Sequence, residues 1–376
     1  MTSRERLLAV LNGKIPDHVP VTPDVSNMVP AKLTGKPFWD IYLYQDPPLW
    51  KAYTDCVKYF GFDGMHTCPL DGFIDSAPIN PDRKTVIVFQ DEERLVTQDY
   101  ELINGKRKWS EGVNVYFAAS PPNWWIDPHA IRLPKEPDKF EPIGEIKQWS
   151  KGEELLKLLK DDLGEHGIVG LSCGTSKLLH SEQDIYDYYD DPQKFYDKRD
   201  MMLKNYDKRF DNILSLEHKP DYINTGGSGT LIHQTPQIFR ELGLPIIKKM
   251  TALAKQHGFP SQLHSCGPEK ELVKILVEET DLTCVDPLEI PPMGDCDLKE
   301  LKKLYGHKIV LKGNLHTTNI MLHGTVADVV EASKRAIDDA AEGGGFILST
   351  GDQCGRDTPD ENLFAMIETA KTYGKY

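Results

Sequence analysis

Residues 261–289, SQLHSCGPEKELVKILVEETDLTCVDPLE, decide the fold class that the sequence predicts. The stretch begins with a β-rich segment, Ser261–Gly267, and continues through residues with helical spacing, Lys270–Glu279. It ends in a second β-rich segment, Leu282–Glu289. A strand, a helix and a strand in this order form a unit with two parallel strands, because the helix returns the chain to the same end of the sheet.

The same alternation recurs along most of the chain. The other expected strands are His18–Val25, Asp63–Pro69, Gly167–Gly174, Asp221–Ser228, Lys308–His316 and Gly345–Asp352. Helical spacing separates several of them, as at Leu298–Tyr305 and Val326–Ala341. Eight strands alternating with helices are the number that closes a (β/α)8 barrel. We therefore predict the α/β class and a single TIM-barrel domain over residues 1–376, with an open doubly wound sheet as the alternative.

The region from about residue 83 to residue 125 breaks the alternation. Thr85–Gln90, Arg94–Ile103 and Val113–Ala118 have the composition of antiparallel strands, and Asn104-Gly105 is a strong hairpin turn signal. We predict a β-hairpin element inserted between barrel strands two and three. The segment Pro121–Pro142 is expected to be a loop that leads into the third helix.

Composition limits the partners and the compartment. The chain of 376 residues has 44 Lys and Arg against 58 Asp and Glu, a net charge of −14, which argues against nucleic acid as the main partner. No apolar run is long enough to cross a membrane, and the N-terminal stretch is too charged for a signal peptide. Seven cysteines without a disulfide framework predict a reducing, cytoplasmic location.

Three residues have the pattern of a metal site. His264 and Cys266 lie two apart, so in an extended segment they point to the same side. Cys354, in Gly-Asp-Gln-Cys-Gly, follows the last expected strand, and the ends of barrel strands meet at one face. Two cysteines and one histidine leave a position open, as in catalytic zinc sites. Any one of these thiols alone would be an ordinary buried cysteine. Asp352 is a fourth ligand, an outer partner of the ligands or a turn cap.

At these residues the chain resembles the uroporphyrinogen decarboxylase superfamily, and within it the zinc-dependent, corrinoid-linked methyltransferases. The resemblance extends over nearly the whole length. Further matching segments are residues 4–13, 16–21, 224–227, 237–239, 244–245, 311–314, 343–349, 358–359 and 361–363. The decarboxylases themselves carry an arginine-bearing motif after the first strand and need no metal. Residues 23–28, Pro-Asp-Val-Ser-Asn-Met, contain no arginine, which weighs against decarboxylation.

The resemblance implies that His264, Cys266 and Cys354 bind Zn²⁺. It also implies methyl transfer, and we favour an O-demethylation that moves a methyl group from a methoxylated aromatic substrate to the cobalt(I) of a corrinoid. The chain has no complete Asp-x-His-x-x-Gly motif, so a separate protein is expected to carry the corrinoid. The alternatives are methyl transfer from a methylcobamide to a thiol such as coenzyme M, a metal-free decarboxylase-like lyase, and a non-catalytic scaffold.

Further residues are candidates for substrate contact and proton transfer. Tyr116, Trp124 and Trp125 stack on an aromatic substrate or, equally, pack the insertion. Asn224, within the fourth expected strand, is a candidate substrate ligand. Asp24 or Asp352 donates a proton to the leaving group, provided that burial keeps the carboxyl protonated.

Overall fold

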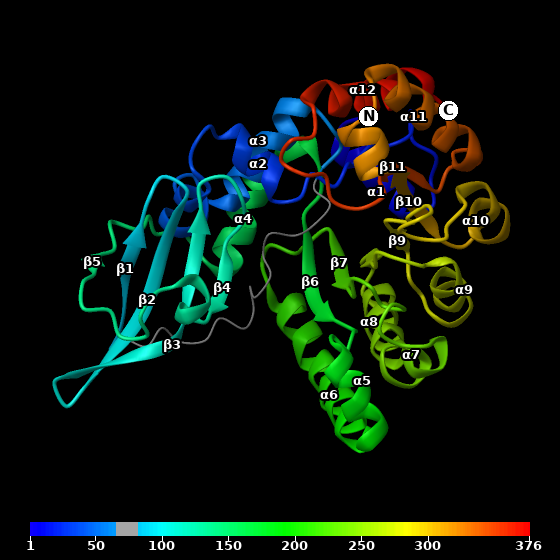
Figure 1. Ribbon diagram of the computed structural model, residues 1–376. Coiled ribbons are helices and arrows are strands. Elements are labelled where there is room, and N and C mark those ends of the chain that lie inside the picture. Colours follow the sequence, from blue (N-terminus) through cyan, green and yellow to red (C-terminus); the bar gives the residue numbers. More distant parts are fainter. Residues whose placement is uncertain (65–81) are drawn as a thin grey trace. The chain divides into compact units, whose positions relative to one another are not determined.

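The computed structural model describes residues 1–64 and 82–376, which divide into two compact units (Figure 1). The barrel unit holds residues 1–25, 57–64 and 156–376, and the β unit holds residues 26–56 and 82–155. The prediction of one domain with an insertion stays a prediction.

A parallel sheet forms the centre of the barrel unit. Among the described residues it has six strands in the order β11-β10-β9-β8-β7-β6, and each neighbouring pair is parallel. The strands are β6 Gly170–Thr175, β7 Tyr222–Gly226, β8 Ser261–His264, β9 Cys284–Asp286, β10 Val310–Leu315 and β11 Phe346–Thr350. Each lies within or next to a segment where the sequence predicts a strand.

The segment around Val21 extends this order beyond β11. Val21 forms a parallel bridge with Leu348, and the Leu348 N–H donates to the Pro20 carbonyl at 2.8 Å. On the other side, the Asp63 N–H donates to the Val21 carbonyl at 2.8 Å. These contacts continue the strand order of a (β/α)8 barrel, and the fold is α/β as predicted. Most of the second expected strand, Asp63–Pro69, lies outside the described residues.

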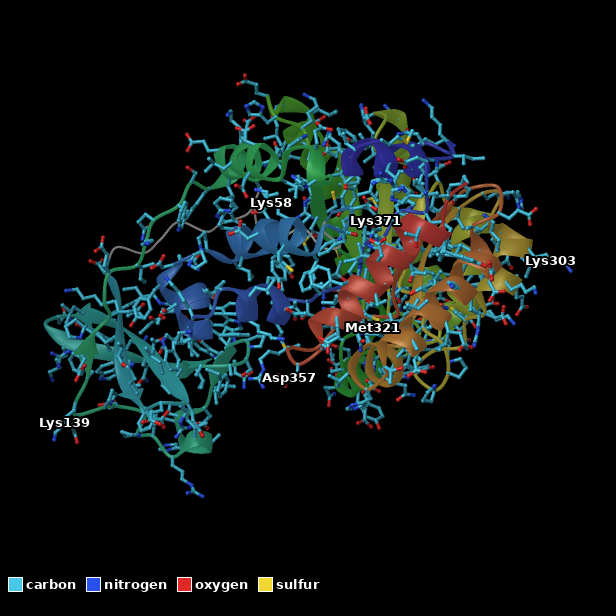
Figure 2. All side chains as sticks on the ribbon, turned by 90° about the horizontal axis from the view of Figure 1, so that it is seen from above. Lys58, Lys139, Lys303, Met321, Asp357 and Lys371 are labelled. Atoms are coloured by element: carbon cyan, nitrogen blue, oxygen red, sulfur yellow. The ribbon has the colours of Figure 1, made fainter. Side chains whose placement is uncertain are left out.

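Helices follow the strands as the sequence predicts. Two of them, α9 Lys270–Glu279 and α10 Leu298–Tyr305, have the expected bounds, and α11 Val326–Ala340 ends one residue early. The others include α4 Gly152–Leu163, α5 Glu182–Asp190, α6 Pro192–Ser215, α7 Pro236–Leu242, α8 Leu244–Gln256 and α12 Asp360–Tyr373. Figure 2 shows α12 from above, with Lys371 and Met321 labelled. The Asn362 amide at the start of α12 donates to the Met321 carbonyl at 3.0 Å, in the π-helical turn η4 Thr317–Leu322.

The interior of the sheet has an apolar layer at the amino ends of the strands and a polar layer above it. The apolar layer joins α1 Ser3–Leu11 to the strands through Leu7, Val10, Leu11, Ile168, Tyr222, Cys284, Val310 and Ile347. Inward-facing residues recur every second position. Two positions further along, the strands carry buried polar side chains, which are Asn224, Asp286, Lys312 and Ser349. Helix α1 therefore covers the end opposite to the strand ends where function is expected.

The β unit contains the predicted antiparallel sheet, and the sheet is larger than predicted. Its strand order is β4-β3-β2-β1-β5, and Asn104 and Gly105 form the turn between β2 and β3 with φ values of 52° and 75°. The strands are β1 Arg83–Gln90, β2 Arg94–Ile103, β3 Lys106–Phe117, β4 Asn123–Ile126 and β5 Glu141–Pro142. The unit also holds α2 Met28–Leu33, the π-helical turn η1 Asp40–Tyr44 and most of α3 Leu49–Phe60.

The prediction of a loop at Pro121–Pro142 is therefore wrong, and the inserted sheet does not end at residue 125. Two short edge strands, β4 and β5, and the 3₁₀ turn η2 Pro128–Ile131 lie in that segment. Such short strands form because β3 and β1 offer them a partner, and local sequence preference carries little of that information. No helix among residues 1–64 and 82–376 is both long and apolar enough to cross a membrane.

Candidate metal centre at the carboxyl ends of the strands

His264 is the last residue of β8, and its two ring nitrogens face different groups. Nδ1 lies 3.4 Å from the Asp286 carboxylate, and Nε2 lies 3.9 Å from the Asp352 carboxylate. Burial of the ring lowers the pKa of His264, but hydrogen bonds with Asp286 and Cys266 outweigh burial and raise that pKa well above 6.5. The imidazole would therefore release a proton on binding a metal ion.

Cys266 lies beside two carboxylates at the ends of other strands. Ligand atoms of Cys266, Glu289 and Asp352 all lie within 4.8 Å of one another. The peptide N–H of Gly267 donates to Glu289 Oε2 at 2.5 Å, which holds that carboxylate against the loop after Cys266. Burial, together with the charge of Asp352, raises the pKa of Glu289. A thiol and two carboxylates at this spacing can share one cation.

Glu289 is a candidate ligand that the sequence analysis missed. It is the last residue of the expected strand Leu282–Glu289, and its side chain is buried. A carboxylate at the carboxyl end of a barrel strand is a signal for a functional residue. That signal could have found Glu289, but it lies in a stretch without a histidine or cysteine motif.

Asp352 reaches the group from a strained backbone position. Its φ is 125°, in a region that side chains other than glycine rarely adopt. It follows β11 and lies between Gly351 and Gln353 in the segment that leads to Cys354. Strain of this kind is typical of functional sites, where the surroundings hold a side chain in place.

Cys354 lies deeper than the three-residue group and is tied to the first strand segment. It is fully buried, and its N–H donates to the Asp24 carbonyl at 2.7 Å. Burial, followed by the charge of Asp24, raises the pKa of the Cys354 thiol to about 12. The Asp24 N–H in turn donates to the Thr350 hydroxyl at 3.0 Å. The charge of Asp24 acts on both His264 and Cys354, so these two candidate ligands lie in the neighbourhood of the same carboxylate.

Asn224 and the aromatic candidates occupy different parts of the molecule. Asn224 is buried on β7 in the polar layer of the barrel unit. The other three residues belong to the β unit. Tyr116 is 6% exposed and packs with Leu43, Ile87 and Leu95, whereas Trp124 and Trp125 are 54% and 62% exposed. The environment of Tyr116 is that of a core residue. The substrate-binding roles of all four residues stay predictions.

The donor atoms fit a zinc ion. Imidazole nitrogen, thiolate sulfur and carboxylate oxygen are the ligands that zinc takes in proteins, and mixed sets of them are typical of catalytic sites. Here His264, Cys266, Glu289 and Asp352 supply all three kinds of donor from three strand ends, with Cys354 close by. The ligand assignment itself stays a prediction.

A comparison with solved structures supports the α/β fold described above. The solved structure of a methyltransferase from Methanosarcina mazei matches 99% of this chain and 99% of its own, with a TM-score of 0.62 and 14% sequence identity. At this identity the match shows the fold alone, and it extends over both compact units.

Sequence comparisons give similarities over part of the chain. Residues 228–373 match the uroporphyrinogen decarboxylase (URO-D) family. A methylcobamide:CoM methyltransferase, MtbA of Methanosarcina acetivorans, is 31% identical over 137 residues, and MtbA of Methanosarcina mazei is 29% identical over 139 residues. Each alignment covers 36% of this chain and 37% of the relative. The chain thus spans little more than a third of the length of the curated relatives it matches. The resemblance to the corrinoid methyltransferase branch of the superfamily is confirmed.

Proposed function

We propose that this protein is a zinc-dependent methyltransferase that exchanges a methyl group with the cobalt of a corrinoid carried by a partner protein. The group formed by His264, Cys266, Glu289 and Asp352 carries the proposal, because it gathers zinc donors at the end of the barrel where catalysis takes place in this fold. The similarity to two methylcobamide:CoM methyltransferases supports the same chemistry.

His264, Cys266 and Cys354 are the proposed permanent ligands. Glu289 and Asp352 compete for the fourth position, which a substrate would take over. Zinc bound there would supply a Lewis acid that lowers the pKa of a thiol or polarises an ether oxygen. The side chains of the chain hold and orient that ion, and the buried Asp24 adds negative charge beside Cys354.

Methyl transfer to a small thiol is the direction we favour. In this direction the thiol loses its proton, its sulfur forms a bond to the methyl carbon, and the electron pair of the Co–C bond stays on cobalt, which goes from cobalt(III) to cobalt(I). The two relatives are named for this reaction. The proposed metal site requires of the substrate only a soft donor atom, such as the sulfur of a thiol.

O-demethylation of a methoxylated aromatic compound is the second candidate. Its sequence-based support came from Tyr116, Trp124 and Trp125. Both tryptophans are exposed enough to stack on a substrate ring, although Trp124 already packs edge-on against Tyr116. Tyr116 itself is committed to the core of the β unit. The remaining observation that favours this candidate is the exposed Trp124-Trp125 pair.

Metal content is the first test. Purified wild-type protein should hold about one zinc ion per chain, and Cys266→Ala and Cys354→Ala should each hold much less. Cys173→Ala is the matched control, because Cys173 is also a buried cysteine on a barrel strand but lies on β6 with its carbonyl bonded to the α6 residues Tyr206 and Arg209. Wild-type protein that neither holds nor takes up zinc would refute the proposal and favour the decarboxylase-like or scaffold alternatives.

Activity then separates the two directions. Free methylcobalamin with 2-mercaptoethanesulfonate should give cobalt(I) and the methyl thioether if the thiol direction holds. Cobalt(I) cobalamin with a methoxylated benzoate should give methylcobalamin if O-demethylation holds. Zinc-loaded protein that supports neither reaction, with free cobalamins or with a corrinoid protein, would favour a scaffold.

A further inference from the structure

Beside His264, the barrel interior holds a buried network of polar side chains, in which Asp286 is the register partner of His264 on the neighbouring strand. Asp286 is fully buried, and its Oδ1 accepts a hydrogen bond from Gln262 Nε2 at 2.9 Å. Its Oδ2 lies 3.4 Å from His264 Nδ1 and 3.8 Å from the Lys312 ammonium. The four residues come from three adjacent strands, β8, β9 and β10.

Burying this network has a free-energy cost for the fold. The interior of a (β/α)8 barrel is normally filled by bulky apolar residues, and the layer below Asp286 is of that kind. Removing a carboxylate and an ammonium from water carries a desolvation penalty that their attraction seldom more than balances. Apolar residues of similar size would stabilise the barrel at least as well, so stability alone does not account for this pair.

The geometry of the network indicates a role in orienting His264. A carboxylate at Nδ1 favours the imidazole tautomer that carries its proton on Nδ1, which leaves the lone pair on Nε2. Nε2 is the nitrogen that faces Asp352 and the group around Cys266. Metal-bound histidines usually have such a carboxylate partner, which fixes the ring orientation and increases its strength as a ligand.

We propose that Asp286 is a positioning residue, which holds His264 in the ring orientation and tautomer that bind the metal ion, and that Gln262 and Lys312 hold Asp286 for this task. The inference rests on the proposed function, because it assigns a role toward zinc. Lys312 balances the charge of Asp286, and Gln262 fixes the second carboxylate oxygen, so the oxygen near His264 has little freedom to turn.

Zinc affinity of an Asp286→Asn variant tests the inference without any assay of activity. Competition with a chromophoric chelator, with Zn²⁺ alone as the probe, should show a 10- to 100-fold weaker affinity than in the wild type. In the metal-free protein, at a pH high enough for the His264 ring to be neutral, its nitrogen chemical shifts should report a shift away from the Nδ1-protonated tautomer. Asp286→Glu, which keeps a carboxylate, should recover part of the affinity.

Asp221→Asn is the matched control. Asp221 is also a buried carboxylate that pairs with cations, but it precedes β7 at the opposite end of the sheet. A merely structural carboxylate should reduce stability and leave zinc affinity within about twofold of the wild type. If Asp286→Asn behaves in this way, the inference is wrong although the proposed function stands.

A double variant keeps the test valid if Asp286→Asn does not fold. Asp286→Asn with Lys312→Met leaves no unpaired buried charge, so it should fold. Its zinc affinity should still be 10- to 100-fold weaker, and wild-type affinity in the double variant would overturn the inference. Wild-type protein that does not bind zinc at all would overturn the proposed function and this inference together.

Discussion

At the scale of single residues, Asp352 has a side chain that serves the site and a backbone conformation that lowers stability. At a φ of 125° any residue with a Cβ atom is strained, by about 1–3 kcal/mol, and only glycine escapes the strain. The protein keeps an aspartate there, next to Cys266 and Glu289. The contribution of the Asp352 carboxylate to the site therefore outweighs the free-energy cost of its strained backbone.

We expect Asp352→Gly to be more stable than Asp352→Ala, by about 1 kcal/mol. Both variants lose the carboxylate, and only the glycine variant also loses the strain. Thermal unfolding of the two variants measures the difference. The same pair at Asp357, an exposed position without a positive φ, is the control, and there glycine should be no better than alanine. An alanine variant at least as stable as the glycine variant would rule out strain at Asp352.

Glu269 gives the stability of the protein an unusual dependence on pH. Complete burial raises its pKa well above 4.5, and its Oε2 accepts a hydrogen bond from the Leu288 N–H at 2.7 Å. The folded protein keeps the proton while the unfolded chain loses it near pH 4.5. This proton therefore stabilises the fold at low pH, and the contribution decreases as pH rises from 4.5 through the pKa of the folded state.

We expect Glu269→Gln to gain stability relative to the wild type as pH increases from 5 to 9, with a slope of up to about 1.4 kcal/mol per pH unit. Glutamine is neutral at every pH and has the shape of the protonated acid. Urea unfolding across this range measures the slope. Glu278→Gln, an exposed position on α9, should have no such slope. Parallel stability curves for Glu269→Gln and the wild type would show that Glu269 is ionised in the folded protein.

The sequence predicted part of the candidate site and missed part of it for a physical reason. His264 and Cys266 stand out because residues two apart in an extended segment point to the same side, so this imidazole and thiol can bind one ion. Glu289 and Asp286 are carboxylates among 58 acidic residues, so only their burial and their neighbours distinguish them. Those neighbours come from other strands, and no local pattern records them.

At the scale of elements, Asp221 joins the N-terminal helix and α4 to the sheet. Its carboxylate accepts hydrogen bonds from Arg4 of α1 at 2.6 Å and from Lys160 of α4 at 3.0 Å. It also accepts one from the Val169 N–H at 2.8 Å, next to β6. Burial by itself raises the pKa of Asp221, but these bonds outweigh burial and lower the pKa below 3.8.

We expect Asp221→Asn to destabilise the protein by roughly 1–3 kcal/mol at pH 7, because it leaves two cations without their buried acceptor. A lowered pKa stabilises the fold above the ordinary value of 3.8, and this stability is lost as pH falls through the pKa of the folded state. The difference between variant and wild type should therefore shrink below about pH 4. Denaturant unfolding at pH 7 and pH 3.5 measures it. An equal difference at both values would contradict the ionic role.

Regular elements were predicted where the pattern is local. The Asn104-Gly105 turn and the helices α9 and α10 have the expected positions, since turn chemistry and helical spacing lie within a few residues. The expected strand His18–Val25 contributes only bridges, at His18 and Val21, and β4 and β5 were not foreseen. Each of these depends on a partner strand that is distant in the sequence.

At the scale of the whole molecule, the apolar layer of the barrel unit is separate from the candidate metal ligands. The apolar layer that joins α1 to the sheet lies at the other end of the strands from the candidate metal centre. We expect removal of zinc by a chelator to leave the helix content and the cooperative unfolding transition intact. Restored zinc should then add about 2.7 kcal/mol at a concentration of 100 times Kd.

Circular dichroism and calorimetry with and without chelator check this expectation. Cys266→Ala is the control, because chelator and zinc should leave its transition unchanged. Loss of the folded state on removal of zinc would instead assign the metal a structural role.

The layer in which α1 packs against Tyr222, Cys284, Val310 and Ile347 has one more consequence. Among the described residues, this apolar layer separates Asp286 and Lys312 from the end of the strands that α1 covers. We therefore expect water and protons to reach the charged pair mainly from the side of His264, where a metal ion would bind. A bound metal ion would then slow proton exchange of Asp286 and Lys312 for as long as it stays bound.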